Sequence, residues 1–493
     1  MELPSATPEA PKAALVESAF SWRLSTSAQW VVLFTIVATI LRVSFLDSKS
    51  FWLDEGLTAT RVTLPINSLL DVLTHGQMNM FLYYLMLHGW TLIAGSSESM
   101  LRFPSVILGV AVVPLIYALG VSLSDRRAGL MAALLMTTNA TSIRYAQTAR
   151  SYSMFVALAT LGSIYFIRTV KRGSLTTFLG YVTSETASVY VHLFGIFALP
   201  CQGIWLALFR RRVKSTIRLT VCMATIGVLS LPEFYFAIKG DFGNEDWVRR
   251  TSLRAVAELF LIFAGAFDER VTILTVVLTA LFLIGVALAV RWAQRDDWSS
   301  VGYLLLSICV PIVLTVAVSI FKPLFVARYL LAGLPLFVLL AAFGFRRLRP
   351  PFAIALMFAI SALSLAQDYS YYRAPSIQDW RGAVNFVATH SQPGDMLAIY
   401  PTYYDGPIRY YFSRRAHPET FPTRILLESI RKAGEDPART LAKSGLDSTR
   451  RLWFTFPAWD ASGENVVGLL HRGQVIEEKG FAGVRLFLLE KSH

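Results

Sequence analysis

Apolar segments of about twenty residues recur along the first three quarters of this sequence, and they constrain the fold more than any other feature. A helix that crosses a bilayer needs ~20 mostly apolar residues. The sequence therefore predicts a polytopic α-helical membrane protein with about 11 spans, at 30–47, 101–122, 128–144, 153–170, 175–191, 193–209, 219–238, 271–291, 299–320, 327–345 and 350–367.

Composition and charge agree with a membrane location. The 493 residues are 54% hydrophobic and 16% charged, whereas an ordinary soluble protein is roughly a quarter charged. The net charge of +13 could suggest nucleic-acid binding. However, the basic residues cluster in short loops between apolar segments, which is typical of membrane topology signals, so no nucleic-acid partner is expected.

The basic loops define the orientation. One alternating set of loops contains clusters of arginine and lysine at 126–127, 171–172, 210–214, 291–295 and 346–349. By the positive-inside rule this set is cytoplasmic, together with an N-terminal tail, 1–29, ahead of a retained first helix. The other set faces outward: 48–100, 145–152, the turn near His192, 239–270 and 321–327. The expected location is a cell (inner) membrane crossed many times, with residues 30–367 forming the transmembrane domain.

Residues 368–493 change to the polar, mixed pattern of a soluble domain. Ser376 is expected to cap a helix that runs to His390, and a second helix is expected in "ENVVGLLH". The segments "MLAIY", "RLWFTF" and "VRLFLLE" have the pattern of buried strands. The sequence predicts a C-terminal extracytoplasmic α/β domain.

Nearly all chemically unusual residues fall in the outward loops, and the acidic pair Asp54 and Glu55 comes first. One interpretation is structural, because acids are favoured in the first turn of a helix on the membrane surface. The other is catalytic, because a carboxylate at this boundary could act as general base for an attacking hydroxyl or amine. The two interpretations are compatible.

The stretch "IRYAQTARSYSM" carries two outward arginines, and a third begins a later span. One interpretation is that these arginine side chains extend along the helix to the membrane–water interface, beside the tyrosines that are common there. Arginine is also suited to hold phosphate through bidentate hydrogen bonds. The candidate phosphate-binding and substrate-binding residues are Arg144, Tyr145, Gln147, Arg150, Tyr152, Arg328 and Tyr329.

Three further polar or aromatic residues are weaker candidates: His192, Asn79 and Tyr83. His192 could be a structural residue at a tight turn, and Asn79 could cap the apolar helix that follows it. The sequence lacks the glycine-rich nucleotide motifs, HExxH, GxSxG and the Asp-x-Asp metal motif. Nucleotide sugars are cytoplasmic, whereas the candidate site faces outward, so a group donor that reaches this site would be carried across the membrane on a lipid.

The order of several segments resembles the bacterial family 39 glycosyltransferases of the GT-C class, relatives of protein O-mannosyltransferases and of the lipid A aminoarabinose transferase. These segments are "FWLDEG", "LYYLMLHGW", "SMLRFPSVILGV", "RYAQTARSYSMFVAL", "YVHLFGIFAL" and "RYLLAGLPLFVLLAA", and they lie within 30–345. The resemblance implies a GT-C-like fold and transfer of a sugar from a polyprenyl phosphate, with inversion. It also implies Asp54 as the base, with Glu55 in support.

Two departures from the family pattern concern the acceptor and the fine geometry. Where many members have "HPPLYY", this chain has Asn79-Met80-Phe81-Leu82-Tyr83-Tyr84, and Thr148 replaces the acid of "YAQEAR".

The sequence leaves three classes of acceptor open: a glycan, a lipid and a protein. No metal motif is present, although a divalent ion at Asp54 or Glu55 stays open. The alternatives are a lipid-linked oligosaccharide ligase or polymerase, and a flippase or transporter of lipid-linked sugars.

Overall fold

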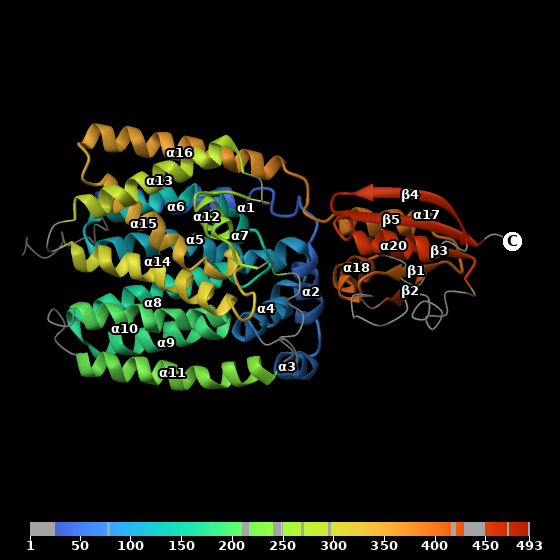
Figure 1. Cartoon of the computed structure of the whole chain (residues 1–493), viewed down its shortest axis with the longest axis horizontal. Helices are drawn as coiled ribbons and strands as arrows, with labels where there is room; N and C mark the ends of the chain where they lie inside the picture. Colours follow the sequence, from blue (N-terminus) through green and yellow to red (C-terminus); the bar gives the residue numbers. More distant parts are fainter. Residues whose placement is uncertain are drawn as a thin grey trace, which may run out of the picture.

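The computed structural model describes residues 25–75, 79–209, 216–239, 248, 250–267, 271–293, 297–415, 421–427, 449–470 and 473–491. Most of the predicted tail 1–29 and the basic residues at 210–214 lie outside these ranges. The described chain forms a helical part followed by a smaller part that contains strands (Figure 1).

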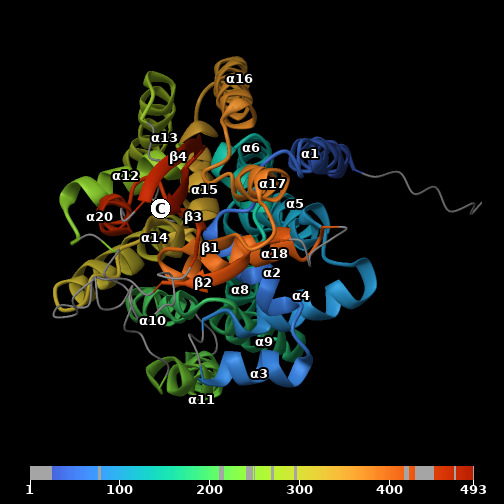
Figure 2. The same ribbon diagram turned by 90° about the vertical axis from the view of Figure 1, so that its right-hand side faces the viewer.

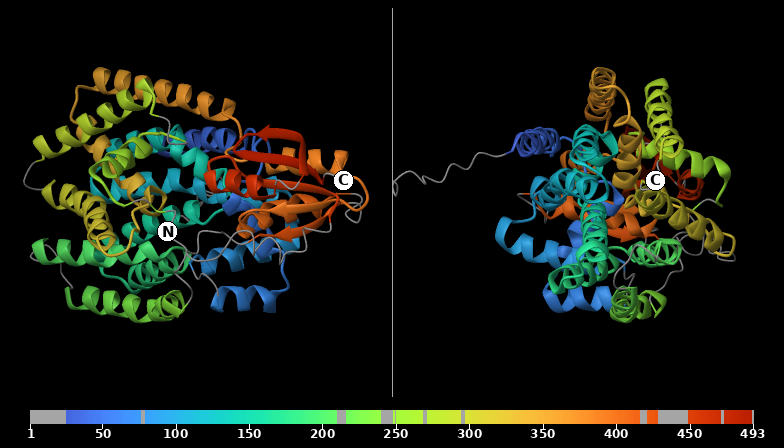
Figure 3. Two further views of the ribbon diagram at one scale, coloured as in Figure 1. Left: turned by 45° about the vertical axis from the view of Figure 1, so that its right-hand side comes forward. Right: turned by 90° about the vertical axis from the view of Figure 1, so that its left-hand side faces the viewer.

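The helical part is a bundle whose longer helices run roughly along the long axis of the molecule (Figures 1 and 3). Its helices are α1 Thr26–Val43, α2 Leu53–Val62, α3 Ile66–His75, α4 Phe81–Ala94, α5 Glu98–Leu123, α6 Arg126–Thr137, α7 Ala140–Ala146, α8 Tyr152–Arg172, α9 Leu175–Val191, α10 Ala198–Phe209, α11 Thr216–Lys239, α12 Leu253–Phe263, α13 Ile273–Arg291, α14 Trp298–Ser319, α15 Gly333–Phe345 and α16 Pro350–Arg373. Two 3₁₀ helices, η1 Leu193–Phe197 and η3 Ala327–Leu330, precede α10 and α15.

Seven of the described helices are long and apolar enough to cross a membrane: α1, α5, α8, α11, α13, α14 and α16. The remaining predicted spans are shorter or broken. The span at 128–144 is interrupted between α6 and α7, where the Asn139 side chain accepts a hydrogen bond from the backbone N–H of Ser142 and starts a new helix. The chain is a multi-pass membrane protein, and the count of eleven spans stays a prediction.

The C-terminal part contains a five-stranded sheet with the order β2-β1-β3-β5-β4. The strands are β1 Met396–Ile399, β2 Thr423–Leu426, β3 Arg451–Pro457, β4 Gly473–Phe481 and β5 Val484–Lys491. Strand β1 pairs in parallel with β2 and β3, whereas β5 is antiparallel to β3 and β4. The helices of this part are α17 Trp380–His390, η4 Thr402–Tyr404, α18 Asp405–Phe412 and α20 Ala461–Leu470.

The sequence identified three of these strands and missed β2 and β4, which are the two edges of the sheet. The predicted helix cap at Ser376 is wrong. Asp379 caps α17, because its carboxylate accepts a hydrogen bond from the Gly382 N–H at 2.9 Å. The Ser376 hydroxyl instead accepts one from the N–H of Ser50, far away in the chain.

The sheet lies beyond one end of the bundle, with α2 and α18 between the sheet and the longer helices (Figures 1 and 2). Basic residues of the predicted cytoplasmic loops gather at the other end. There Arg346 donates to Asp125 at 2.5 Å and to Asp297 at 2.8 Å, which joins three loops. Within the described residues, the basic loops joined by Arg346 therefore lie at the end of the bundle opposite the sheet (Figure 1).

Candidate active site

The two neighbouring acids of the first outer loop point in different directions from the first turn of α2. Glu55 is buried and pairs with Arg102 of α5 through two hydrogen bonds, both of 2.8 Å. The N–H of Ala149 donates a third bond to the same carboxylate, at 2.8 Å. Both oxygens of Glu55 are therefore occupied, and this side chain ties α2 to α5 and to the loop before α8.

Asp54 is instead partly open, with 20% of its side chain exposed. Its carboxylate faces Arg150 across 3.7 Å, between Oδ2 and Nη2. The Arg150 side chain also lies 3.4 Å from the hydroxyls of Thr58 and Tyr84. Its buried Nε atom has no hydrogen-bond partner. Arg150 therefore places a positive charge directly beside the partly open Asp54 carboxylate.

Arg328 of η3 approaches the same place from the other side of the bundle. Its guanidinium lies 5.8 Å from the centre of the Trp52 ring and 5.6 Å from that of Tyr329. It also interacts electrostatically with Asp54 and with Tyr152 and Tyr145. The ring centres of Tyr145 and Tyr152 are 5.1 Å apart. Two cations and a carboxylate thus share a site that aromatic rings surround.

His192 lies beneath this site, at the turn between α9 and η1. Its ring stacks on Phe155 at 4.9 Å and contacts Tyr329 at 5.1 Å between centres. Burial, with the positive charges of Arg150 and Arg328 in addition, lowers the pKa of His192 to about 3. Its Nδ1 accepts the N–H of Phe194, so the neutral ring carries its proton on Nε2. His192 can donate one hydrogen bond but does not supply a charge.

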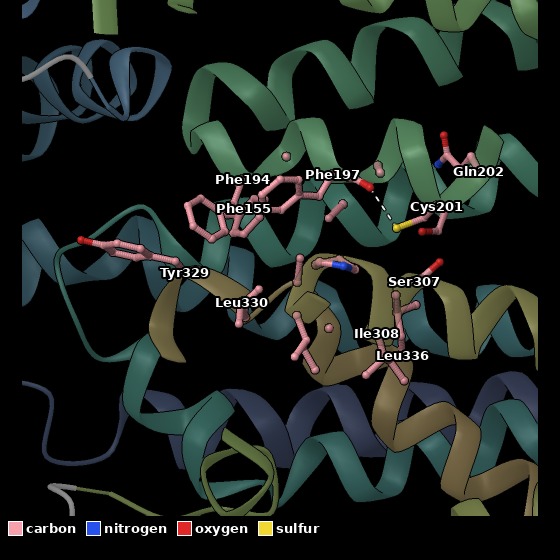
Figure 4. A pocket seen from close by; sticks show the side chains of 18 of the residues that line it. Phe155, Phe194, Phe197, Cys201, Gln202, Ser307, Ile308, Tyr329, Leu330 and Leu336 are labelled. Carbon is pink, nitrogen blue, oxygen red and sulfur yellow. Dashed lines mark hydrogen bonds between the residues drawn. The ribbon is translucent and has the colours of Figure 1, made fainter. Parts of the chain in front are cut away.

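A pocket begins at Tyr329 and runs into the bundle between α8, α10, α14 and α15. Figure 4 shows Tyr329 at one end of the pocket and Cys201 with Gln202 at the other. Most of its lining is apolar or aromatic, with Phe155 and Phe194 near the Tyr329 end. The charged site therefore adjoins an apolar pocket that extends among the helices.

Four other predicted residues have different surroundings. The Gln147 amide donates to backbone oxygens at the end of α1, including Ser44 at 2.7 Å, so it is used within the fold. The Asn79 carbonyl accepts the N–H of Leu193 and holds the turn after His192. Arg144 packs over the Tyr145 ring next to it. Tyr83 is fully buried, and its hydroxyl has no hydrogen-bond partner.

Sequence analysis missed three residues of this region: Arg102, Tyr84 and Trp52. Arg102 had a usable signal, because an arginine at the start of an apolar span needs a partner. Tyr84 accepts hydrogen bonds from Arg61 and Arg150, and nothing in the sequence distinguished it from Tyr83. Within the described residues no three His, Cys, Asp or Glu side chains are grouped as metal ligands.

Comparison with solved structures finds the same fold in membrane-bound transferases. ArnT from Cupriavidus metallidurans, solved with undecaprenyl phosphate bound, aligns with a TM-score of 0.62 and 13% identity, over 94% of this chain and 98% of that one. An oligosaccharyltransferase from Archaeoglobus fulgidus in its apo form aligns with a TM-score of 0.56 and 13% identity, over 92% of this chain and 73% of that one.

The archaeal oligosaccharyltransferase AglB, solved with an inhibitory peptide and a dolichol phosphate, aligns with a TM-score of 0.54 and 12% identity, over 87% of this chain and 69% of that one. No protein-family model and no curated protein matches the sequence. At these identities the comparisons show the fold: this chain has the GT-C fold that its sequence predicted, with a C-terminal domain containing a sheet.

Proposed function

We propose that this protein is a glycosyltransferase that moves a monosaccharide from a polyprenyl-phosphate carrier to an acceptor at the outer face of the cytoplasmic membrane, with inversion. One observation carries the proposal. A partly open carboxylate, Asp54, faces two half-buried arginines, Arg150 and Arg328, at the mouth of an apolar pocket. This combination suits a ligand with a sugar, a phosphate and an isoprenoid tail.

In the proposed reaction Asp54 is the general base. It accepts the proton of an acceptor hydroxyl, whose oxygen attacks the anomeric carbon from the face opposite the phosphate. The bond between that carbon and the phosphate oxygen breaks, and its electron pair leaves with the lipid phosphate. Arg150 and Arg328 stabilise the negative charge that develops on this leaving group.

The pocket that begins at Tyr329 would hold the first isoprene units behind the phosphate. A polyprenyl chain is longer than this pocket, so the rest of the tail would lie against the apolar outer surface of the helices. In this proposal the Nε2–H of His192 donates a hydrogen bond to the lipid-linked sugar. Because the ring is neutral, His192 contributes no charge to the reaction.

The test is transfer of label from a radiolabelled polyprenyl-monophosphate sugar to a panel of glycan, lipid and protein acceptors, with purified protein. Asp54→Asn should reduce transfer by about 100-fold or more, because a general base contributes 10²–10⁴-fold. Asp71→Asn on α3 is the matched control, since that side chain is 75% exposed and should leave transfer unchanged.

Near-normal turnover by Asp54→Asn would overturn the assignment of the base. Label that never leaves the lipid fraction, with any acceptor, would favour a flippase or transporter. A parallel assay with a pyrophosphate-linked oligosaccharide tests the ligase alternative, which predicts transfer from that donor alone.

A further inference from the structure

The segment that leads into α2 is held by side chains of the C-terminal part. The hydroxyl of Ser376 accepts the N–H of Ser50 at 2.9 Å, and the hydroxyl of Tyr411 accepts the N–H of Phe51 at 2.7 Å. The side-chain oxygen of Gln378 accepts the N–H of Leu53 at 2.6 Å. Three backbone donors immediately before Asp54 thus depend on residues more than 300 positions later in the chain.

Helix α2 needs such a partner because its own cap residue does not provide one. The first N–H groups of a helix have no acceptor within the helix, and a polar side chain at the N-cap usually supplies it. The N-cap of α2 is Trp52, which makes no side-chain cap bond. Gln378 provides the acceptor from the C-terminal part instead.

The orientation of Gln378 is fixed by its own surroundings. Its side chain is buried, with 2% exposure. The oxygen that accepts the Leu53 N–H also accepts the indole N–H of Trp380, at 3.0 Å. Two donors on the same oxygen determine which side of the amide faces α2.

Tyr411 connects the same segment to α5. Its hydroxyl accepts the Phe51 N–H and donates to Glu98, the first residue of α5. The other oxygen of Glu98 receives a hydrogen bond from Arg381 at 2.6 Å. Arg381 also donates to the backbone oxygens of Asp47 and Lys49, at 2.9 and 3.1 Å.

Close packing leaves α2 little room to move against the C-terminal part. A Cβ atom at Gly56 would lie 2.5 Å from Pro407 of α18, and one at Gly406 would lie 2.9 Å from Leu57. Backbone atoms of α2 and α18 are therefore in direct contact one turn after Leu53.

From these contacts we infer that Gln378 and Tyr411 are positioning residues for Asp54, and that the C-terminal part completes the active site. This inference rests on the proposed function. Gln378 holds the backbone of Leu53, the residue that precedes Asp54. Tyr411 holds the backbone of Phe51, two residues earlier in the chain. The distance from the Asp54 carboxylate to an acceptor hydroxyl is then set by two parts of the chain together.

The experiment compares full-length wild type with Gln378→Met, which removes the acceptor atom at similar size. Gln392→Met, at an exposed position of the same part, is the matched control. Gln378→Met should lower kcat by about tenfold to 100-fold and leave the KM for the lipid donor within about twofold, because small displacements of a reacting group have effects of this size. Tyr411→Phe should act in the same direction.

Hydrogen–deuterium exchange gives a readout that does not depend on activity. In Gln378→Met the amides of 51–56 should exchange faster than in wild type, while those of α4 stay unchanged. Gln378→Glu, which keeps an acceptor oxygen, should restore slow exchange. If the amides of 51–56 exchange at the wild-type rate in a folded Gln378→Met protein, the inference is overturned. If the wild-type protein has no transferase activity, only the proposed function is overturned.

Discussion

Asp54 and Glu55 are neighbours in sequence, but their environments give them different roles. Glu55 is enclosed by Arg102 and the Ala149 N–H, so it has no oxygen left for a substrate. Asp54 contacts Arg150 across 3.7 Å, but 20% of its side chain stays exposed, so its carboxylate is open to a ligand on that side. At the residue scale, Glu55 fixes α2, and this is the form of support for Asp54 that we propose.

Glu55→Gln should destabilise the folded protein strongly. The change leaves Arg102 with a buried, unpaired charge, and breaking such a pair costs about 3–5 kcal/mol. The measurement is the thermal unfolding midpoint of the full-length protein in detergent, with and without the substitution.

Glu258→Gln on α12 is the control for this change. Glu258 pairs with Arg254 at the surface, where the Glu258 side chain is 45% exposed, and such a pair contributes only ~0.3–0.5 kcal/mol. If Glu55→Gln and wild type have the same unfolding midpoint, the pair of Glu55 and Arg102 does not hold α2.

At the scale of elements, α2 is the point where the helical and C-terminal parts meet. It packs against α18 on one side and is tied to α5 by Glu55 on the other. Because both contacts involve the first two turns, α2 cannot be displaced from one part without disturbing the other.

Gly56→Ala should disturb this junction. The Cβ atom of the new alanine would lie 2.5 Å from atoms of Pro407, which is closer than van der Waals contact allows. Overpacking of this kind costs about 1–3 kcal/mol. Both the unfolding midpoint and the rate of sugar transfer should fall.

Gly89→Ala on α4 provides the comparison, because no atom lies within 4 Å of its Cβ position. Alanine is the better helix former by up to ~1 kcal/mol, so this variant should be as stable as wild type or more stable. A Gly56→Ala protein that behaves like Gly89→Ala would contradict tight packing of α2 on α18.

At the scale of the whole molecule, charge is separated between the two ends of the bundle. Loops rich in arginine lie at the end opposite the sheet and the candidate active site (Figure 1), so the positive-inside rule predicts that the sheet and the site face outward. Two acidic residues, Glu185 of α9 and Glu233 of α11, are buried within predicted spans.

Cysteine labelling tests this orientation in a variant that lacks the three native cysteines. A cysteine at Gln392, exposed in the C-terminal part, should react with a membrane-impermeant maleimide in intact spheroplasts. A cysteine at Thr176, exposed at the start of α9, should react only after the membrane is opened. The reverse pattern would place the candidate site on the cytoplasmic side.

The sequence alone determined the class of fold, and it predicted that the chemistry lies in the outward loops. Hydrophobic segments about as long as a bilayer is thick, alternating with basic loops, can be recognised without tertiary contacts because each signal is local. Three of the five strands were predicted for the same reason, whereas β4 is interrupted by charged residues on an exposed edge.

The tertiary structure decided which polar residues belong together. Glu55 and Arg102 are 47 positions apart, and Leu53 and Gln378 are 325 apart, so no local pattern reveals either contact. Gln147 lies in the same short stretch as Arg150 but bonds to α1, because the chain turns between the two residues. The sequence identified Asp54 as a candidate base, and only packing showed that side chains of the C-terminal part bind the segment just before it.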